Sequence, residues 1–217
     1  MRAIPGDAVL TRLATAPDHA VELPFVSDTR ILLGLASLLS LPNLIAAIDS
    51  ARRVAVDGRS GGDCDVDAVL TALREHPGLW GVRRLREALA SSRPGVGSRS
   101  ETLLRLILAG AGFPEPVVGF SIRGAGWSAT PDLAWPEWNV LVEYEGDHHR
   151  TDDRQFAHDV RRFDRYHDVG WSTIRATRTD VYSSTRELIA RVDRRLRARG
   201  WRGPVRCREL AIPAFLP

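Results

Sequence analysis

Apolar residues recur at the spacing of amphipathic helices through the first part of the chain, up to about Arg93. The pattern predicts four helices, with a turn-rich run at residues 57–65 between the second and the third. Their leucine and alanine faces are expected to pack against one another, so this part is assigned no chemistry. The predicted helices cover residues 29–39, 43–53, 66–75 and 80–90.

A run rich in Ser, Pro and Gly at residues 91–97 marks the clearest boundary in the chain. Ser98 and Glu101 then have the spacing of a capping box, and the helix that they begin is expected to end near Gly110. The boundary predicts a helical N-terminal region at residues 1–95 and a second domain at residues 96–217.

The second domain alternates between strand-like and helical patterns. After its first helix, the order α, β, β, β, α, β predicts an α/β fold, with the three consecutive strands in a meander. A last helix at residues 184–199 has Leu188, Val192 and Leu196 on one side. The predicted strands cover residues 117–122, 128–134, 138–145 and 171–176, and the charged helix before the last strand covers residues 152–168.

Composition limits the class of protein. Hydrophobic residues make up 44% and charged residues 26% of the chain, which is typical of a folded globular protein. The apolar run at residues 31–48 is interrupted by Pro42 and Asn43, so it predicts two short buried helices and no membrane span. The first 21 residues lack a continuous apolar stretch, and Cys64 and Cys207 have no metal-ligand spacing, so a cytoplasmic protein is expected.

The positive charge is carried entirely by arginine. All 30 basic residues are arginines, the net charge is +3, and the pI is about 9.4. Because the guanidinium fork suits phosphate oxygens, DNA is the expected partner. In the arginine-rich last helix, Arg194, Arg195 and Arg199 are expected to contact phosphates, and the alternative is a solvated helix face.

Carboxylates gather on two of the predicted strands. Asp132 follows Pro131, and Glu143 and Glu145 are two residues apart, so they share one face of a strand. Neighbouring strands lie about 4.8 Å apart, so these acids can converge on one divalent ion. Glu143 also follows an apolar run, where a carboxylate without a partner is costly, and this favours a functional role.

The chain resembles the uncharacterised relatives of the very-short-patch-repair (Vsr-like) endonucleases, a family of the PD-(D/E)XK nuclease superfamily. The resemblance covers about residues 98–196, and the helical first part more loosely resembles a region found in antitoxin-like factors. The residues that carry it are Glu101, Pro131 with Asp132, Glu143 to Gly146, His149, Asp159 with Arg162, and Gly170 with Trp171 leading to Arg175.

The resemblance implies a restriction-endonuclease-like αβββαβ core that hydrolyses DNA phosphodiesters with Mg²⁺ or Mn²⁺. Asp132, Glu143 and Glu145 would hold the metal ion, Glu101 would assist from the helix, and Arg162 would contact nucleic acid. The lysine that this superfamily carries two residues after the second acid is replaced by Glu145. Arginine is too basic to accept a proton, so Glu145 or His149 would take over the proton transfer, or the domain no longer cuts.

Each candidate residue also has a structural interpretation. Glu101 can serve as the capping-box acid, Asp132 as a turn residue, and Glu145 as an exposed strand end. His148 and His149 point different ways on an extended chain, and the family pattern favours His149. Asp159 and Arg162 have the spacing of a surface pair on a helix.

Two functional hypotheses follow. The first is a metal-dependent endonuclease, and the second is a catalytically inactive DNA-binding or regulatory (antitoxin-like) module with the nuclease fold. The retained acids favour the enzyme, and the missing lysine favours the module. A glycosidase is disfavoured because only 7% of the residues are aromatic. The sequence leaves the oligomeric state open.

Overall fold

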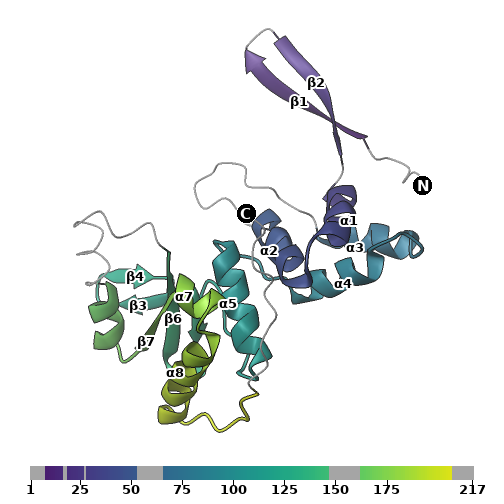
Figure 1. Ribbon diagram of the computed structural model, residues 1–217. Helices are drawn as coiled ribbons and strands as arrows, with labels where there is room; N and C mark the ends of the chain where they lie inside the picture. The colour runs from purple at the N-terminus through teal and green to yellow at the C-terminus, as the bar shows by residue number, and fades with distance from the viewer. Residues whose placement is uncertain (1–7, 17–18, 27, 53–65, 147–161, 207–217) are drawn as a thin grey trace.

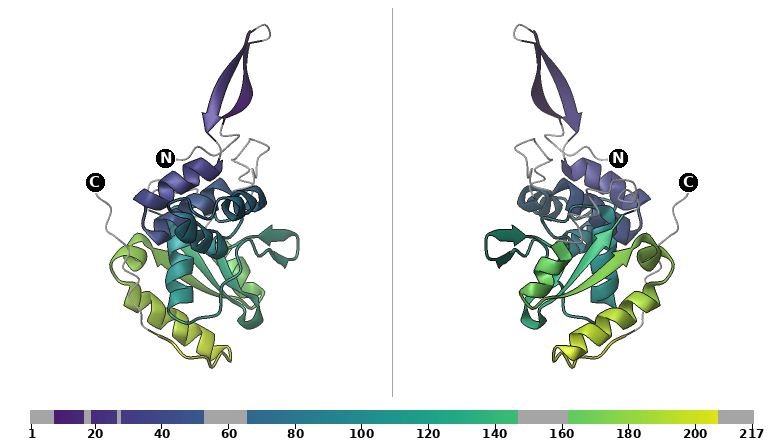
Figure 2. Two further views of the ribbon diagram at one scale, coloured as in Figure 1. Left: turned by 90° about the vertical axis from the view of Figure 1, so that its right-hand side faces the viewer. Right: turned by 90° about the vertical axis from the view of Figure 1, so that its left-hand side faces the viewer.

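The computed structural model describes residues 8–16, 19–26, 28–52, 66–146 and 162–206. Two strands come first, β1 (Ala8–Ala16) and β2 (His19–Val26), and they pair antiparallel. This hairpin projects away from the rest of the molecule in all three views (Figures 1 and 2). It was not among the elements that the hydrophobic pattern predicted.

Four helices follow, at the places that the apolar spacing predicts. They are α1 (Asp28–Leu38), α2 (Leu41–Ala51), α3 (Val66–Glu75) and α4 (Val82–Ser91). Their buried side chains, among them Leu44, Ile48, Leu73 and Leu85, form what we call the helical core. Within the described residues, no helix has the length and apolar character needed to cross a membrane.

Proline and glycine set the ends of these helices. Pro42 lies in the first turn of α2, where its missing N–H costs nothing, so the apolar run is divided into α1 and α2 as expected. Gly81 has a φ of 86°, and a Cβ there would lie 3.3 Å from the Cβ of Ala36. This left-handed residue makes α4 begin at Val82 and not at residue 80.

Helix α5 (Arg99–Gly110) contacts both halves of the molecule. Leu103, Leu104 and Leu108 pack against the sheet, whereas Leu106 packs against the helical core. Ser98 caps the helix by accepting a hydrogen bond from the Glu101 N–H at 3.2 Å. The Glu101 carboxylate accepts from the Gly97 N–H at 2.7 Å, one residue earlier than an ordinary capping box places it.

The central sheet has three strands in the order β5-β6-β7. The strands are β5 (Leu133–Trp135), β6 (Val140–Glu145) and β7 (Ser172–Thr177). β5 and β6 are antiparallel, and β6 and β7 are parallel. A separate hairpin of β3 (Ile122–Gly124) and β4 (Trp127–Ala129) adjoins them, and Val117 forms an isolated bridge with Ala134.

The strand prediction is confirmed only in part. The run at residues 117–122 is not a strand, because Val117 forms only an isolated bridge and β3 begins at Ile122. The predicted meander of three consecutive strands is also wrong, because β3 and β4 form a hairpin separate from β5 and β6. The run at residues 128–134 is divided into β4 and β5 at Pro131, which has no N–H to donate to a strand ladder. The run at residues 138–145 begins late, because the 3₁₀ turn η1 (Pro136–Trp138) precedes Asn139, whose φ of 50° is left-handed. The sheet is a mixed one with helices on both faces.

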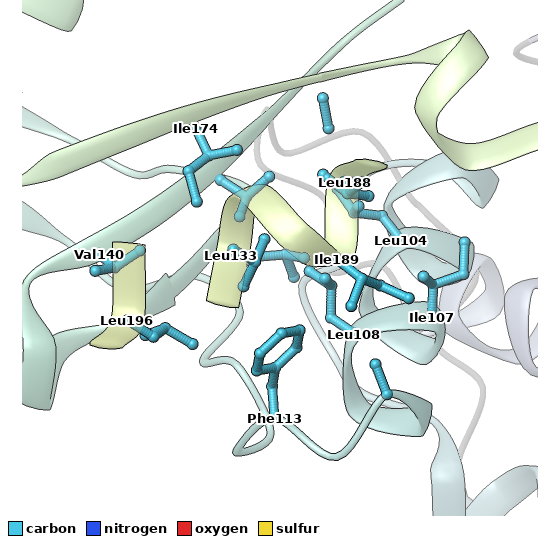
Figure 3. Close-up of a cluster of buried hydrophobic side chains, with 14 of the residues drawn as sticks. Leu104, Ile107, Leu108, Phe113, Leu133, Val140, Ile174, Leu188, Ile189 and Leu196 are labelled. Carbon is cyan, nitrogen blue, oxygen red and sulfur yellow. The ribbon is translucent and has the colours of Figure 1, made fainter. Parts of the chain in front are cut away.

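Helices cover the two faces of this sheet unequally. On one face α5, α7 (Arg178–Tyr182) and α8 (Thr185–Ala198) enclose a large cluster that we call the sheet core (Figure 3). On the other face, a helical segment at residues 162–168 packs Tyr166 against Leu141 and Ala134. Phe163 packs on the same cluster, as the predicted inner face of that helix requires. The chain is thus a mixed α/β protein.

Candidate functional site

The strand register brings two of the predicted carboxylates face to face. Leu133 pairs with Val142 and Ala134 with Leu141, so continuing this register places Asp132 opposite Glu143. Directly opposed residues of antiparallel strands have Cβ atoms roughly 4.5–5.5 Å apart. Val142 points into the sheet core, so its neighbour Glu143 points to the other face, toward Tyr166.

Burial and neighbouring charge both act on Asp132. Burial, then the negative charges of Glu101 and Glu143, raise the pKa of Asp132 to about 7. The Tyr144 N–H, which donates to Asp132 Oδ2 at 2.7 Å, and the Arg162 cation oppose this shift. Near neutral pH both the protonated and the ionised form of the Asp132 carboxyl are therefore populated, and a nearby cation would favour the ionised form.

Glu143 is almost completely buried, with 2% of its surface exposed. Its Oε1 accepts a hydrogen bond from the Tyr166 hydroxyl at 3.1 Å, and its Oε2 lies 3.5 Å from Arg162 Nη2. Burial and the Glu143 charge raise the pKa of Tyr166, so its hydroxyl stays protonated and donates to the carboxylate. Both partners come from one turn of the 162–168 helical segment, four residues apart.

Tyr166→Phe is expected to destabilise the fold by about 1–3 kcal/mol, because it removes a hydrogen bond to a buried carboxylate. Urea unfolding of the two proteins measures the difference. Tyr144→Phe is the control, because its hydroxyl makes no hydrogen bond within the described part of the chain, and it should cost less than about 0.5 kcal/mol. Equal losses for the two variants would contradict the assigned role of Tyr166.

Glu101 reaches the same group of acids from the first turn of α5. Its negative charge raises the pKa of Asp132, so the two carboxyl groups interact electrostatically. A Cβ on Gly97 would lie 3.1 Å from both carboxylate oxygens of Glu101, so the glycine gives this side chain room. Glu101 thus accepts a hydrogen bond at the helix N-terminus and lies near enough to Asp132 for its charge to raise that pKa.

Glu145 lies on the same face of β6 as Glu143 but has a different partner. It forms an ion pair with Arg175 of β7, whose guanidinium lies 5.1 Å from the centre of the Phe163 ring. Arg162 also stacks on Phe163, at 5.8 Å. The structure therefore gathers Glu101, Asp132 and Glu143, whereas Glu145 is engaged by an arginine at the edge of this group.

The candidate histidine lies outside the described residues. His149 and its neighbour His148 fall in the range 147–161, as does Asp159, the expected companion of Arg162. Arg162 itself lies against Glu143. One sequence signal pointed to the place of Arg162 and Tyr166 beside the carboxylates. The two residues are four apart, and this spacing puts both side chains on one face of a helix.

The arginines of α8 lie far from the carboxylates. β7 runs parallel to β6 and ends with Thr177 beside Glu145, and α8 then returns along the sheet. Leu196 near its end packs in the sheet core with Val140, at the start of β6 (Figure 3). Arg194, Arg195 and Arg199 are exposed toward this end, about 14 to 21 Å along the axis from the beginning of the helix.

Two proteins of Mycobacterium tuberculosis are similar to this chain, one from strain CDC 1551 / Oshkosh and one from strain ATCC 25618 / H37Rv. Both are uncharacterized, and each is 30% identical over 189 residues. The similarity covers 85% of this chain and 62% of each relative, so the chain spans less than two thirds of their length. No protein-family model and no solved structure matches the chain.

Proposed function

We propose that the protein is a metal-dependent endonuclease of the PD-(D/E)XK type, related to the Vsr-like family, that hydrolyses DNA phosphodiester bonds. The observation that carries the proposal is the pairing of Asp132 with the buried Glu143 across two strands, near enough to Glu101 of α5 for its charge to act on Asp132. The order of α5, the short strands, the 162–168 helical segment and β7 supports the restriction-endonuclease-like core that the sequence resembles.

The donor chemistry suits a hard divalent cation. Mg²⁺ is commonly bound by one or two carboxylates, with water and substrate phosphate supplying the other oxygens. Asp132 and Glu143 are such a pair, and a cation between them would relieve the repulsion that raises the pKa of Asp132. Among the residues that the structure describes, no group of three or more Asp, Glu, His or Cys side chains is arranged to hold a metal ion. The proposal places the cation between the two carboxylates that the strand register brings opposite one another.

Each side chain has a separate task in this proposal. Asp132 and Glu143 would hold Mg²⁺ or Mn²⁺, which when bound stabilises phosphate charge and lowers the pKa of water. The Tyr166 hydroxyl and Arg162 fix the Glu143 carboxylate, and Glu101 adds negative charge beside Asp132. His149 is proposed from the sequence as the proton acceptor in place of the missing lysine.

A second candidate function is supported by the internal pairing of the acids. Tyr166 and Arg162 engage Glu143, and Arg175 engages Glu145, so much of the negative charge is balanced by the protein itself. A nuclease fold that binds DNA without cutting it would retain these ion pairs for stability. This alternative is a DNA-binding or regulatory module.

One experiment separates the two functions. The full chain is incubated with duplex DNA, single-stranded DNA and RNA, with Mg²⁺, Mn²⁺ or a chelator, and products are resolved on a denaturing gel. The endonuclease predicts internal cleavage of DNA that requires the cation and disappears with the chelator. Binding of DNA without cleavage under every condition would support the regulatory module and contradict the enzyme.

Cation binding should depend on pH with a defined sign. The pKa of Asp132 is raised to about 7, and a cation binds the ionised carboxylate, so protons compete with it below that pH. Mn²⁺ is expected to bind about tenfold more weakly at pH 6 than at pH 8, as measured by calorimetry. Equal dissociation constants at the two pH values would contradict the role of Asp132 as a ligand.

A further inference from the structure

A second cluster of charged and aromatic side chains lies at the edge of the sheet that carries the carboxylates. Arg99 Nη1 donates to the Tyr182 hydroxyl at 2.7 Å, and its guanidinium carbon lies 5.7 Å from the centre of the Tyr182 ring. Arg178 stacks on the same ring at 5.2 Å. We call these three residues the Tyr182 cluster.

The topology fixes the cluster close to the candidate site. Thr177 at the end of β7 pairs with Glu145, and Arg178 is the next residue, so its Cα lies within about 9 Å of the Glu145 Cα. On the other side, Arg99 and Glu101 share the first turn of α5. In DNA each strand rises about 3.4 Å per nucleotide, so a strand lying over the carboxylates passes the cluster within a few nucleotides.

Arg99 is held in place before any ligand arrives. Asn43 Oδ1 accepts from Arg99 Nε at 3.0 Å and from Nη2 at 2.7 Å, and the Tyr182 hydroxyl accepts from Nη1. A fixed guanidinium loses little side-chain entropy when an anion binds to it. The contacts with Asn43 of α2 also tie the helical part to this edge of the sheet.

Arg178 takes no part in these hydrogen bonds between Arg99, Asn43 and Tyr182. Its side chain is exposed and stacks on the Tyr182 face, at most about 11 Å from the Arg99 guanidinium. An exposed guanidinium fixed on a ring beside a second arginine is a group that a phosphate oxygen can reach without disturbing the core.

Two other arginines at this edge of the sheet lie against acids. Arg162 and Arg175, which both stack on Phe163, lie against Glu143 and Glu145. The Tyr182 cluster brings Arg99 and Arg178 to the same edge, next to the end of β7.

We propose that Arg99 and Arg178, held on Tyr182, bind a backbone phosphate of the nucleic-acid strand next to the carboxylates. This inference rests on the proposed function, because it assigns a substrate contact to the same edge of the sheet. It is an alternative to the expectation that Arg194, Arg195 and Arg199 contact phosphates, which stays a prediction and is tested by the comparison with Arg199 below.

The test compares Arg178 with Arg199, which carry the same charge at different positions in the fold. Binding of labelled duplex and single-stranded DNA by the full chain is measured in chelator at several salt concentrations, for Arg178→Gln and for Arg199→Gln. Both side chains are exposed, so neither variant disturbs the core. Arg178→Gln should weaken duplex binding roughly tenfold at low salt and reduce the slope of log K against log salt by about 0.9. Arg199→Gln should change neither quantity.

The outcomes separate this site from the proposed chemistry. If the protein binds DNA through Arg178 but cleaves no DNA with any cation, the result supports the phosphate site and contradicts the proposed endonuclease activity. If the protein cleaves DNA and the Arg178→Gln variant binds and cleaves DNA as the parent does, the result supports the endonuclease activity and contradicts the phosphate site. A larger loss for Arg199→Gln, or no DNA binding by the parent, also overturns the site.

Discussion

Asp132→Asn is expected to abolish cation-dependent cleavage of DNA, lowering the rate at least about a thousandfold. The substitution removes a charge from the carboxylate pair and leaves an amide oxygen that can still accept the Tyr144 N–H. A divalent cation in such a site contributes several kcal/mol to the transition state, and each 1.36 kcal/mol is a factor of ten. Single-turnover cleavage in Mg²⁺ and in Mn²⁺ measures the loss.

The same variant should be more stable than the parent at pH 8. The folded pKa of Asp132, about 7, lies above the ordinary value of 3.8, so its contribution to stability is fully present below about pH 4. That contribution is lost as the pH rises toward 7 and remains lost above it. Asp132→Asn carries no charge to desolvate, so its free energy of unfolding should exceed that of the parent at pH 8 and match it near pH 4.

Asp164→Asn is the matched control, because Asp164 is exposed on the helical segment that carries Tyr166. It makes the same chemical change and should alter neither cleavage nor the pH profile of stability. Cleavage by Asp132→Asn at the parental rate would remove the residue from the mechanism. A variant that unfolds at pH 8 would instead assign Asp132 a structural role.

Arg105→Ala is expected to destabilise the protein by about 3–5 kcal/mol, the usual cost of removing one partner of a buried ion pair. Arg105 and Asp49 are each 1% exposed, and Arg105 Nη2 lies 3.4 Å from Asp49 Oδ2. Burial raises the pKa of Asp49, and the Arg105 cation opposes that shift. Without the arginine, the carboxyl group on α2 is left buried without its cation.

Chemical denaturation of two further variants makes this prediction specific. Arg93→Gln removes another arginine near the same network, but one whose side chain is 39% exposed and 3.5 Å from Glu115, so it should cost less than about 1 kcal/mol. Combining Arg105→Met with Asp49→Asn should recover part of the loss, because no buried charge is left without a partner; Glu115, the other acid that Arg105 contacts, is 39% exposed. A cost below about 1 kcal/mol for Arg105→Ala would show that the pair is energetically minor.

Local patterns predicted the helices well and the strands less well. Helical spacing located α1 to α5 within a few residues, because amphipathic helices carry their pattern within one segment. The ends of the strands are set by single residues. Pro131 divides one predicted strand, and Asn139 delays the start of another. The β1–β2 hairpin gave no strong turn signal at its centre, where Pro17 and Asp18 stand.

The candidate site was predicted where alternation along a strand determines which side chains share a face. Asp132 and Glu143 lie opposite one another, as expected for neighbouring strands. The sequence did not show that Arg162 and Tyr166 would meet Glu143, or that Arg175 would pair with Glu145, because these contacts depend on how distant segments pack. Nor does periodicity give the direction of α8, which carries its last arginines away from the carboxylates.

Helix α5 has one consequence for how the molecule unfolds. Its leucines enter the sheet core on one side, while Leu106, Thr102 and Arg105 meet α2 and its surroundings on the other. Neither cluster can melt without stripping one face of α5 and exposing the polar groups that it buries. Residues 91–97 mark a change in composition along the chain, but because α5 contributes side chains to both clusters, we expect the two parts to unfold in one cooperative step.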